Sequence, residues 1–107
     1  MESIRILLCC GAGMSSGFLA QQARKYAQKQ KLDVQIEARS ESEIGQYLKV
    51  IDVLLIGPHY ANHLEEFTRM ASGYDVAVAV VPKDIYSGLD GEALVEFAYE
   101  TKRGQKD

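Results

Sequence analysis

Four short apolar runs, each followed by a longer segment of mixed polarity, constrain the fold of this chain more than any other feature. The runs are IRILLC at 4–9, DVQIEAR at 33–39, IDVLLIG at 51–57 and DVAVAVVP at 75–82. Their length and composition predict β-strands, and the alternation in the second run gives it one less buried face. Because parallel strands need helix-length connections, the alternation predicts an α/β fold with a four-stranded parallel sheet flanked by helices on both faces.

The segments between the runs show apolar residues at helical intervals, which predicts helices. We expect these helices over 16–31, from Ile44 to Leu48, over 61–71 and over 90–102. No linker, internal repeat or low-complexity tract interrupts the alternation, so residues 1–107 are expected to form one domain.

Residues at the expected helix ends support these assignments. Ser40 and Glu43 match a capping box, in which each side chain accepts a bond from the other residue's backbone N–H. Asp90 is a natural N-cap for the last helix, and Gly73 is expected to close the third. Pro58 has no N–H to give to a sheet, so the third strand should end before it.

Three loops are expected to meet at one edge of the sheet. They cover residues 10–16, 57–61 and 82–89, and each follows the carboxyl end of a predicted strand. In open parallel sheets this edge is where ligands bind.

Composition and length exclude several classes of protein. A net charge of −3 gives no argument for binding nucleic acid or an acidic membrane surface. No apolar run has the length of a transmembrane helix, and the N-terminal sequence lacks the layout of a signal peptide. We therefore expect a cytoplasmic protein whose two adjacent cysteines stay reduced, since they could form only a strained disulfide.

The stretch CCGAGMSSG at 9–17 stands where the first strand turns into the first helix. Cys9 belongs to the strand pattern and is expected to be a buried, inert thiol. Cys10 begins the loop, where amides at a helix start and the helix dipole favour a thiolate, the nucleophilic form. A phosphoryl group on its sulfur would be held by loop amides and two hydroxyl groups. The predicted phosphate-binding residues are Gly11, Ala12, Gly13, Met14, Ser15 and Ser16.

Two familiar phosphate-binding motifs are absent from this loop. No Gly-Lys-Ser/Thr follows, so it is not a Walker-type loop. Ser16 stands where a dinucleotide fingerprint needs Gly or Ala.

Three stretches carry a resemblance to a known family. CGAGMSS at 10–16 resembles the phosphorylation loop of enzyme IIB of the bacterial sugar phosphotransferase system, lactose/cellobiose type. DVLLIGPHY at 52–60 is similar to its third strand and Gly-Pro-Gln turn, and YSGLDG at 86–91 is similar to the segment before its last helix. Two residues depart from the pattern: Gly11 replaces a Ser or Thr, and His59 replaces the glutamine.

The resemblance implies a fold, a reaction and partners. The fold is a four-stranded parallel sheet in a phosphatase-like layout. Cys10 would take a phosphoryl group from a phosphohistidine on enzyme IIA and pass it to a sugar entering through the membrane component, enzyme IIC. No cofactor or metal is implied, and we expect a monomer at the inner face of the membrane only while it contacts enzyme IIC. The sequence of this chain does not identify the sugar.

Two other functions compete with a phosphoryl relay. Low-molecular-weight tyrosine phosphatases have a similar layout, but their loop reads C-x5-R, whereas Ser16 stands at that distance from Cys10 and no Asp-Pro pair is present. An arginine clamp can be worth orders of magnitude in rate, so its absence favours a carrier. A thiol redox or anion-binding module is the third candidate, although the usual C-x-x-C is missing.

Several residues keep two interpretations at this point. His59 either faces the cysteine loop and donates a hydrogen bond to phosphate when protonated, or is a solvated turn residue. Its spacing from His63 suits zinc, but no third ligand stands nearby in a recognisable pattern. Tyr60 and Tyr86 are candidates for the rim of the site and a partner surface, although Tyr86 could equally pack as a loop aromatic. Met14 either contacts partners or folds onto the core.

Overall fold

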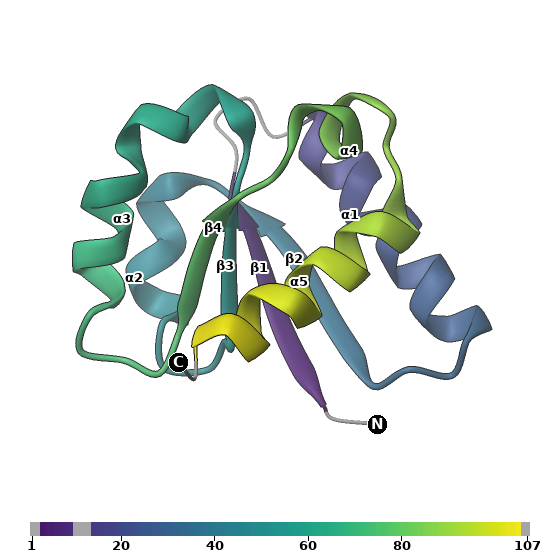
Figure 1. Cartoon of the computed structure of the whole chain (residues 1–107), viewed down its shortest axis with the longest axis horizontal. Coiled ribbons are helices and arrows are strands. Elements are labelled where there is room, and N and C mark those ends of the chain that lie inside the picture. Colours follow the sequence, from purple (N-terminus) through teal and green to yellow (C-terminus); the bar gives the residue numbers. More distant parts are fainter. Residues whose placement is uncertain (1–2, 10–13, 106–107) are drawn as a thin grey trace.

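A parallel sheet with the predicted four strands forms the centre of the protein (Figure 1). The computed structural model describes residues 3–9 and 14–105, apart from the side chains of 14–16 and 105. The strands are β1 (Ile4–Cys9), β2 (Val34–Arg39), β3 (Val53–Ile56) and β4 (Ala77–Val80). All neighbouring pairs are parallel and the order is β2-β1-β3-β4, which confirms the predicted α/β fold.

Helices connect the strands at the predicted places, with differences at their ends. The α-helices are α1 (Met14–Lys29), α2 (Ile44–Tyr47), α3 (Leu64–Ala71), α4 (Lys83–Ser87) and α5 (Gly91–Gln105). Two 3-10 segments precede α2 and α3, namely η1 (Glu41–Glu43) and η2 (Pro58–His63). The predicted helix over 61–71 is therefore two elements, because the backbone leaves helical geometry at Tyr60 and His63.

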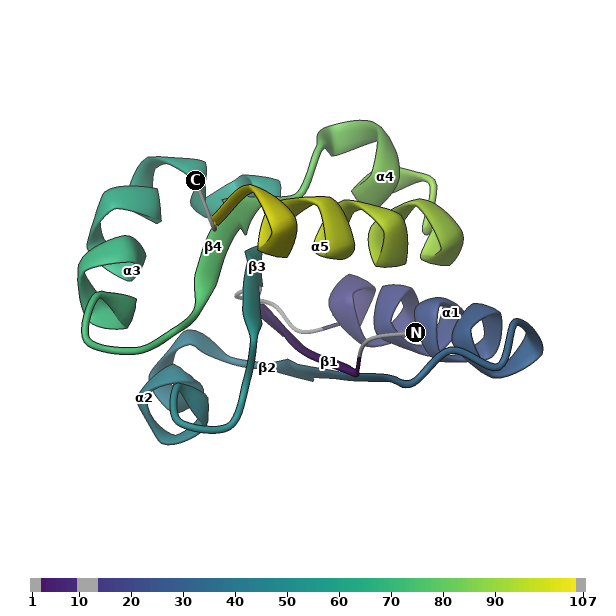
Figure 2. The same ribbon diagram turned by 60° about the horizontal axis from the view of Figure 1, so that its bottom comes forward.

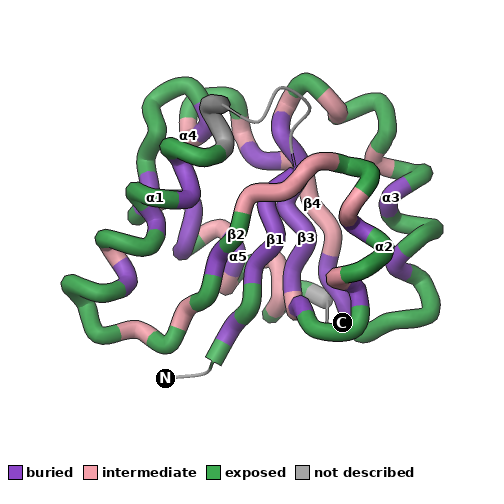
Figure 3. Tube along the Cα trace, turned by 180° about the vertical axis from the view of Figure 1, so that it is seen from behind, coloured by how far each residue is buried: buried purple, intermediate pink, exposed green. Residues whose placement is uncertain are grey.

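The helices cover both faces of the sheet (Figure 2). α1, α4 and α5 lie on one face, and α2 and α3 lie on the other. Successive strand residues point to opposite faces, so Leu8 and Leu55 belong to the first core while Leu7 and Leu54 belong to the second. Figure 3 shows the result: the central strands are mostly buried and the helices are exposed on their outer sides.

Two of the three expected loops contain helical turns. Residues 57–61 include the first part of η2, and α4 occupies Lys83–Ser87 within residues 82–89. Pro82 stands at the N-cap position with an extended backbone, and Ile85 and Tyr86 pack on the first core. A helix of five residues is too short to produce a periodic pattern, so only its tertiary contacts reveal it.

The helix caps agree with the predictions in part. The backbone N–H of Ala93 donates to the Asp90 carboxylate at 3.0 Å, which confirms Asp90 as an N-cap. The capping box at Ser40 and Glu43 is wrong, because the Ser40 hydroxyl donates to the Glu43 carboxylate instead of either side chain bonding a backbone amide. α3 ends at Ala71 with Ser72 as its C-cap, one residue before Gly73.

Candidate functional site at the carboxyl edge of the sheet

The connections that follow β1, β3 and β4 leave from the same edge of the sheet. Gly57, directly after β3, donates its backbone N–H to the carbonyl oxygen of Cys9 at 2.8 Å. Val81, directly after β4, donates in the same way to Ile56 at 2.8 Å. These two bonds tie the start of η2 to the end of β1, and the approach to α4 to the end of β3. In Figure 1, η2 and α4 lie at the end of the sheet where these strands finish.

The predicted phosphate loop is only partly within the described residues. Cys10, Gly11, Ala12 and Gly13 lie outside them. Helix α1 begins at Met14, two residues before the expected start, so Met14, Ser15 and Ser16 form its first turn. The roles predicted for all seven residues remain predictions.

Cys9 is fully buried, which confirms its predicted place in the core. It packs with Leu7 and Ile56 in the cluster beneath α2 and α3. Because Cys9 ends β1 and its carbonyl is bound by Gly57, the end of this strand has a fixed place on the edge.

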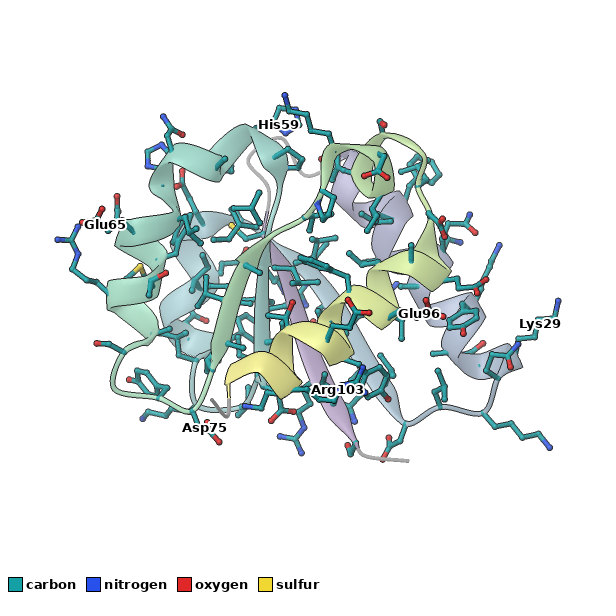
Figure 4. The ribbon with its side chains drawn as sticks, in the orientation of Figure 1. Lys29, His59, Glu65, Asp75, Glu96 and Arg103 are labelled. Atoms are coloured by element: carbon teal, nitrogen blue, oxygen red, sulfur yellow. The ribbon has the colours of Figure 1, made fainter. Side chains whose placement is uncertain are left out.

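His59 and Tyr86 come together across the edge, although they belong to different elements. Their ring centroids are 5.4 Å apart and the ring planes are inclined by 75°, an edge-to-face contact. Tyr86 is 9% exposed and packs in the core beneath α1, α4 and α5, as one of its two interpretations requires, and its place at the rim of the site stays a prediction. His59 is exposed on the outer side of the pair (Figure 4).

A surface pocket of about 430 Å³ opens between η2 and α4 at this contact. Among the described residues its walls are Pro58, His59, Lys83, Tyr86 and Ser87. Lys83 and Ser87 were not among the predicted site residues, because both belong to the short helix that was expected to be a loop. The signal that could have indicated α4 is Pro82 followed by an apolar pair, Ile85 and Tyr86.

Tyr60 turns to the other side of η2. Its ring contacts the rings of His63 and Phe67, with centroids 5.5 and 6.4 Å away, and it packs against the core beneath α3. His63 lies 3.7 Å from the Glu66 carboxylate. Tyr60 is therefore not part of the pair formed by His59 and Tyr86.

No group of three metal-ligating side chains occurs among the described residues, so His59 and His63 gain no third ligand there. In the same part of the chain, every helix falls short of the length and apolar character that crossing a membrane requires.

A larger pocket lies elsewhere in the described part of the chain. It measures about 660 Å³ and opens between the end of α1 and the middle of α5. Its polar lining includes Tyr26, Tyr99, Glu96, Glu100 and Arg103. Figure 4 shows Glu96 and Arg103 along α5, well away from His59. By size alone, this groove would be the candidate site. The strand ends and the position of Cys9 favour the carboxyl edge of the sheet instead.

Comparison with protein families shows which family the chain belongs to. Residues 5–97 match the family described as the lactose/cellobiose-specific IIB subunit of the PTS system, the sugar phosphotransferase system. The chain belongs to this IIB family. The resemblance carried by CGAGMSS, DVLLIGPHY and YSGLDG is thereby confirmed, and a general role in phosphoryl transfer to sugars follows.

Individual IIB relatives cover nearly the whole chain. The oligo-beta-mannoside-specific EIIB component of Bacillus subtilis is 30% identical over 94 residues, which are 88% of this chain and 91% of the relative. The galactose-specific EIIB component of Lactococcus lactis is 31% identical over 98 residues, which are 87% and 91% of the two chains. IIB components of this system work with IIA and IIC components.

Solved structures agree with this assignment. The cellobiose-specific IIB component of Borrelia burgdorferi is 30% identical, with a TM-score of 0.77 over 97% of this chain and 95% of that one. The lactose-specific IIB domain of Streptococcus pneumoniae has a TM-score of 0.84 over 94% of this chain and 98% of that domain. At 16% identity, the second match shows the fold alone.

Proposed function

We propose that Cys10 is the phosphoryl carrier of this IIB component. It accepts a phosphoryl group from a phosphohistidine on enzyme IIA and passes it to a sugar that enters through enzyme IIC. The observation that carries the proposal is the position of Cys9, which ends β1 with its carbonyl bound by Gly57 at the edge where η2 and α4 meet. Cys10 follows directly, and α1 begins four residues later at Met14.

Each of the two transfers breaks one bond to phosphorus and forms another. In the first, the N–P bond of the phosphohistidine breaks and an S–P bond to the Cys10 thiolate forms, and the imidazole nitrogen keeps the electron pair. In the second, the oxygen of a sugar hydroxyl forms an O–P bond, the S–P bond breaks with its electron pair kept on the Cys10 sulfur, and the hydroxyl proton passes to solvent. Positioning and charge stabilisation carry most of such a reaction.

A carrier must also keep its phosphocysteine from water. Residues 10–16 contain no arginine that could clamp the phosphoryl group in a hydrolytic transition state. This absence favours a carrier over a phosphatase of similar layout.

In this proposal the IIC component, and not this chain, determines which sugar receives the phosphoryl group. The named relatives act in systems for oligo-beta-mannosides, galactose and cellobiose, so close IIB sequences serve different sugars. We propose a monomer in the cytoplasm that contacts each partner in turn, at the membrane only through enzyme IIC.

Labelled phosphoenolpyruvate, the general phosphotransfer proteins and enzyme IIA test the proposal. Mass spectrometry of the unchanged protein should place one phosphoryl group on Cys10, and Cys10→Ser should lose all transfer. Cys9→Ser is the matched control, because it changes the neighbouring thiol: it should keep transfer and lose about 1–3 kcal/mol of stability, since a hydroxyl enters the apolar core.

Three results would contradict the proposal. Label on a histidine would move the carrier site away from Cys10. Appreciable turnover of an aryl phosphate would favour a phosphatase. An unmodified thiol that a mild oxidant links to Cys9 would favour a redox module.

A further inference from the structure

The edge that carries Cys10 needs positive charge that its own loop does not contain. A phosphoryl group and a thiolate bring several negative charges together. Residues 10–17 include no lysine or arginine, and the first basic residue after them is Arg24, in the middle of α1. The α1 amides supply only partial charge. A cation from another element would complete the site.

Arg39 is the nearest candidate by sheet register, but its guanidinium is already engaged. It ends β2 in register with Cys9 on β1. Its Nε donates to the Tyr47 hydroxyl at 2.8 Å, and it forms ion pairs with Glu37 and Glu43. These partners also raise the pKa of Arg39, the Tyr47 bond most, so the charge is held on the α2 side of the sheet.

Lys83 is differently placed. It is the first residue of α4, it is exposed, and it makes no ion pair or hydrogen bond within the part of the chain that the structure describes. Asp84 follows it without pairing to it. Lys83 lines the 430 Å³ pocket opposite Pro58 and His59.

This pocket is tied to the cysteine through the backbone. Pro58 follows Gly57, whose N–H binds the carbonyl of Cys9, and that carbonyl belongs to the peptide group that links Cys9 to Cys10. On the other wall, Tyr86 donates its backbone N–H to the carbonyl of Pro82 at 3.1 Å, which fixes the first turn of α4. The contact between the His59 and Tyr86 rings joins the two walls.

We propose that Lys83 neutralises the oxygens of the phosphoryl group while it moves to and from Cys10, and that the pocket beside it seats the ring that donates the group. The inference rests on the proposed function. The pocket suits a flat ring such as imidazole, because Pro58 and Tyr86 supply apolar walls, and His59 and Ser87 supply polar groups. The N–P bond breaks and the S–P bond forms with the Lys83 ammonium beside the oxygens, and Lys83 itself keeps its proton.

Lys83→Gln tests the charge at constant length. We expect the rate of Cys10 phosphorylation at saturating enzyme IIA to fall about tenfold or more, since lost electrostatic stabilisation acts on the transition state. Lys83→Arg should recover most of the rate, because it restores the charge. Lys49→Gln is the matched control: Lys49 is exposed, follows α2, and should leave the rate unchanged.

The outcomes separate this inference from the function on which it rests. If the unchanged protein gains no phosphoryl group on Cys10, the proposed function fails. If it does, and Lys83→Gln reacts at the same saturated rate, the role of Lys83 is refuted. A change in KM alone would also refute it, because Lys83 would then contribute only to docking.

Discussion

Two openings in the described part of this protein differ in size, lining and position, and the smaller one lies at the carboxyl edge of the sheet. The groove between α1 and α5 has a volume of about 660 Å³, whereas the pocket between η2 and α4 has about 430 Å³. Two carboxylates and one guanidinium, of Glu96, Glu100 and Arg103, line the groove and leave it a net negative charge, whereas Lys83 lines the pocket. A phosphoryl group would be repelled by the first lining and attracted by the second.

The groove and the pocket also differ in origin. Gly91, the first residue of α5, lies so close to α1 that an added Cβ would overlap the backbone of Gln22 and Ala23. From this contact the two helices diverge, and the groove opens between their farther parts (Figure 1). The pocket arises instead where strand ends converge, and convergence of strand ends is what brings functional groups together in this fold.

The largest expected effect in this comparison comes from Gly91→Ala. The new methyl group would meet backbone, which cannot rotate away, so the start of α5 must move from α1. We expect a loss of about 3 kcal/mol in the free energy of unfolding, as overpacked cores show. Urea denaturation followed by circular dichroism measures it.

Gly104→Ala is the control on the same helix. A Cβ at Gly104 meets no atom within 4 Å, so this variant should gain up to about 1 kcal/mol from helix propensity. Equal stability of the two variants would mean that the helices do not meet at Gly91, and the account of the groove would be wrong.

The fold was largely predictable from the sequence because its signals are local. Each strand is a short apolar run. Asp90 marks the start of α5, because its carboxylate accepts a bond from a backbone N–H of the same helix. α4 escaped prediction because it depends on the packing of Ile85 and Tyr86 against distant elements. The capping box failed because the Ser40 hydroxyl bonds the Glu43 side chain and no backbone amide of the helix start.

The edge of the sheet at which the site is proposed could be predicted from the sequence, but the residues that line its pocket could not. The order of strands places three loops on one edge, which a pattern of alternating elements already implies. The pairing of His59 with Tyr86 rather than with its neighbour Tyr60 depends on the backbone turn within η2, and no sequence pattern specifies that turn. Lys83 could be predicted as a pocket residue only after α4 had been recognised as a helix.

A smaller effect tests what holds the start of α5 against α1. Asp90→Ala removes the bond to the Ala93 N–H and should lower the free energy of unfolding by about 1 kcal/mol. Asp84→Ala is the matched control, since Asp84 lies in the first turn of α4 and its side chain makes no bond among the described residues. It should change stability by less than about 0.5 kcal/mol. If both substitutions cost the same, the Asp90 cap does not anchor this end of the helix.

The smallest effect tests the charge of the groove itself. Burial raises the pKa of Tyr26 above its ordinary value of 10.0, and the carboxylates of Glu92 and Glu96 raise it further. Glu96→Gln should therefore lower the pKa of Tyr26 towards 10.0 without reaching it, because burial is the larger cause. NMR titration of the tyrosine ring carbons resolves this residue, and Glu65→Gln on α3 should leave its pKa unchanged.

The raised pKa of Tyr26 also makes the stability of the protein depend on pH. Since folding raises the pKa of Tyr26, its contribution to stability is complete below pH 10 and is lost as the pH rises through the folded value. Glu96→Gln should move that loss to lower pH while leaving phosphoryl transfer unchanged, because Glu96 lines the groove and not the pocket. A slower transfer in this variant would mean that the groove takes part in the reaction, and the distinction between the two openings would fail.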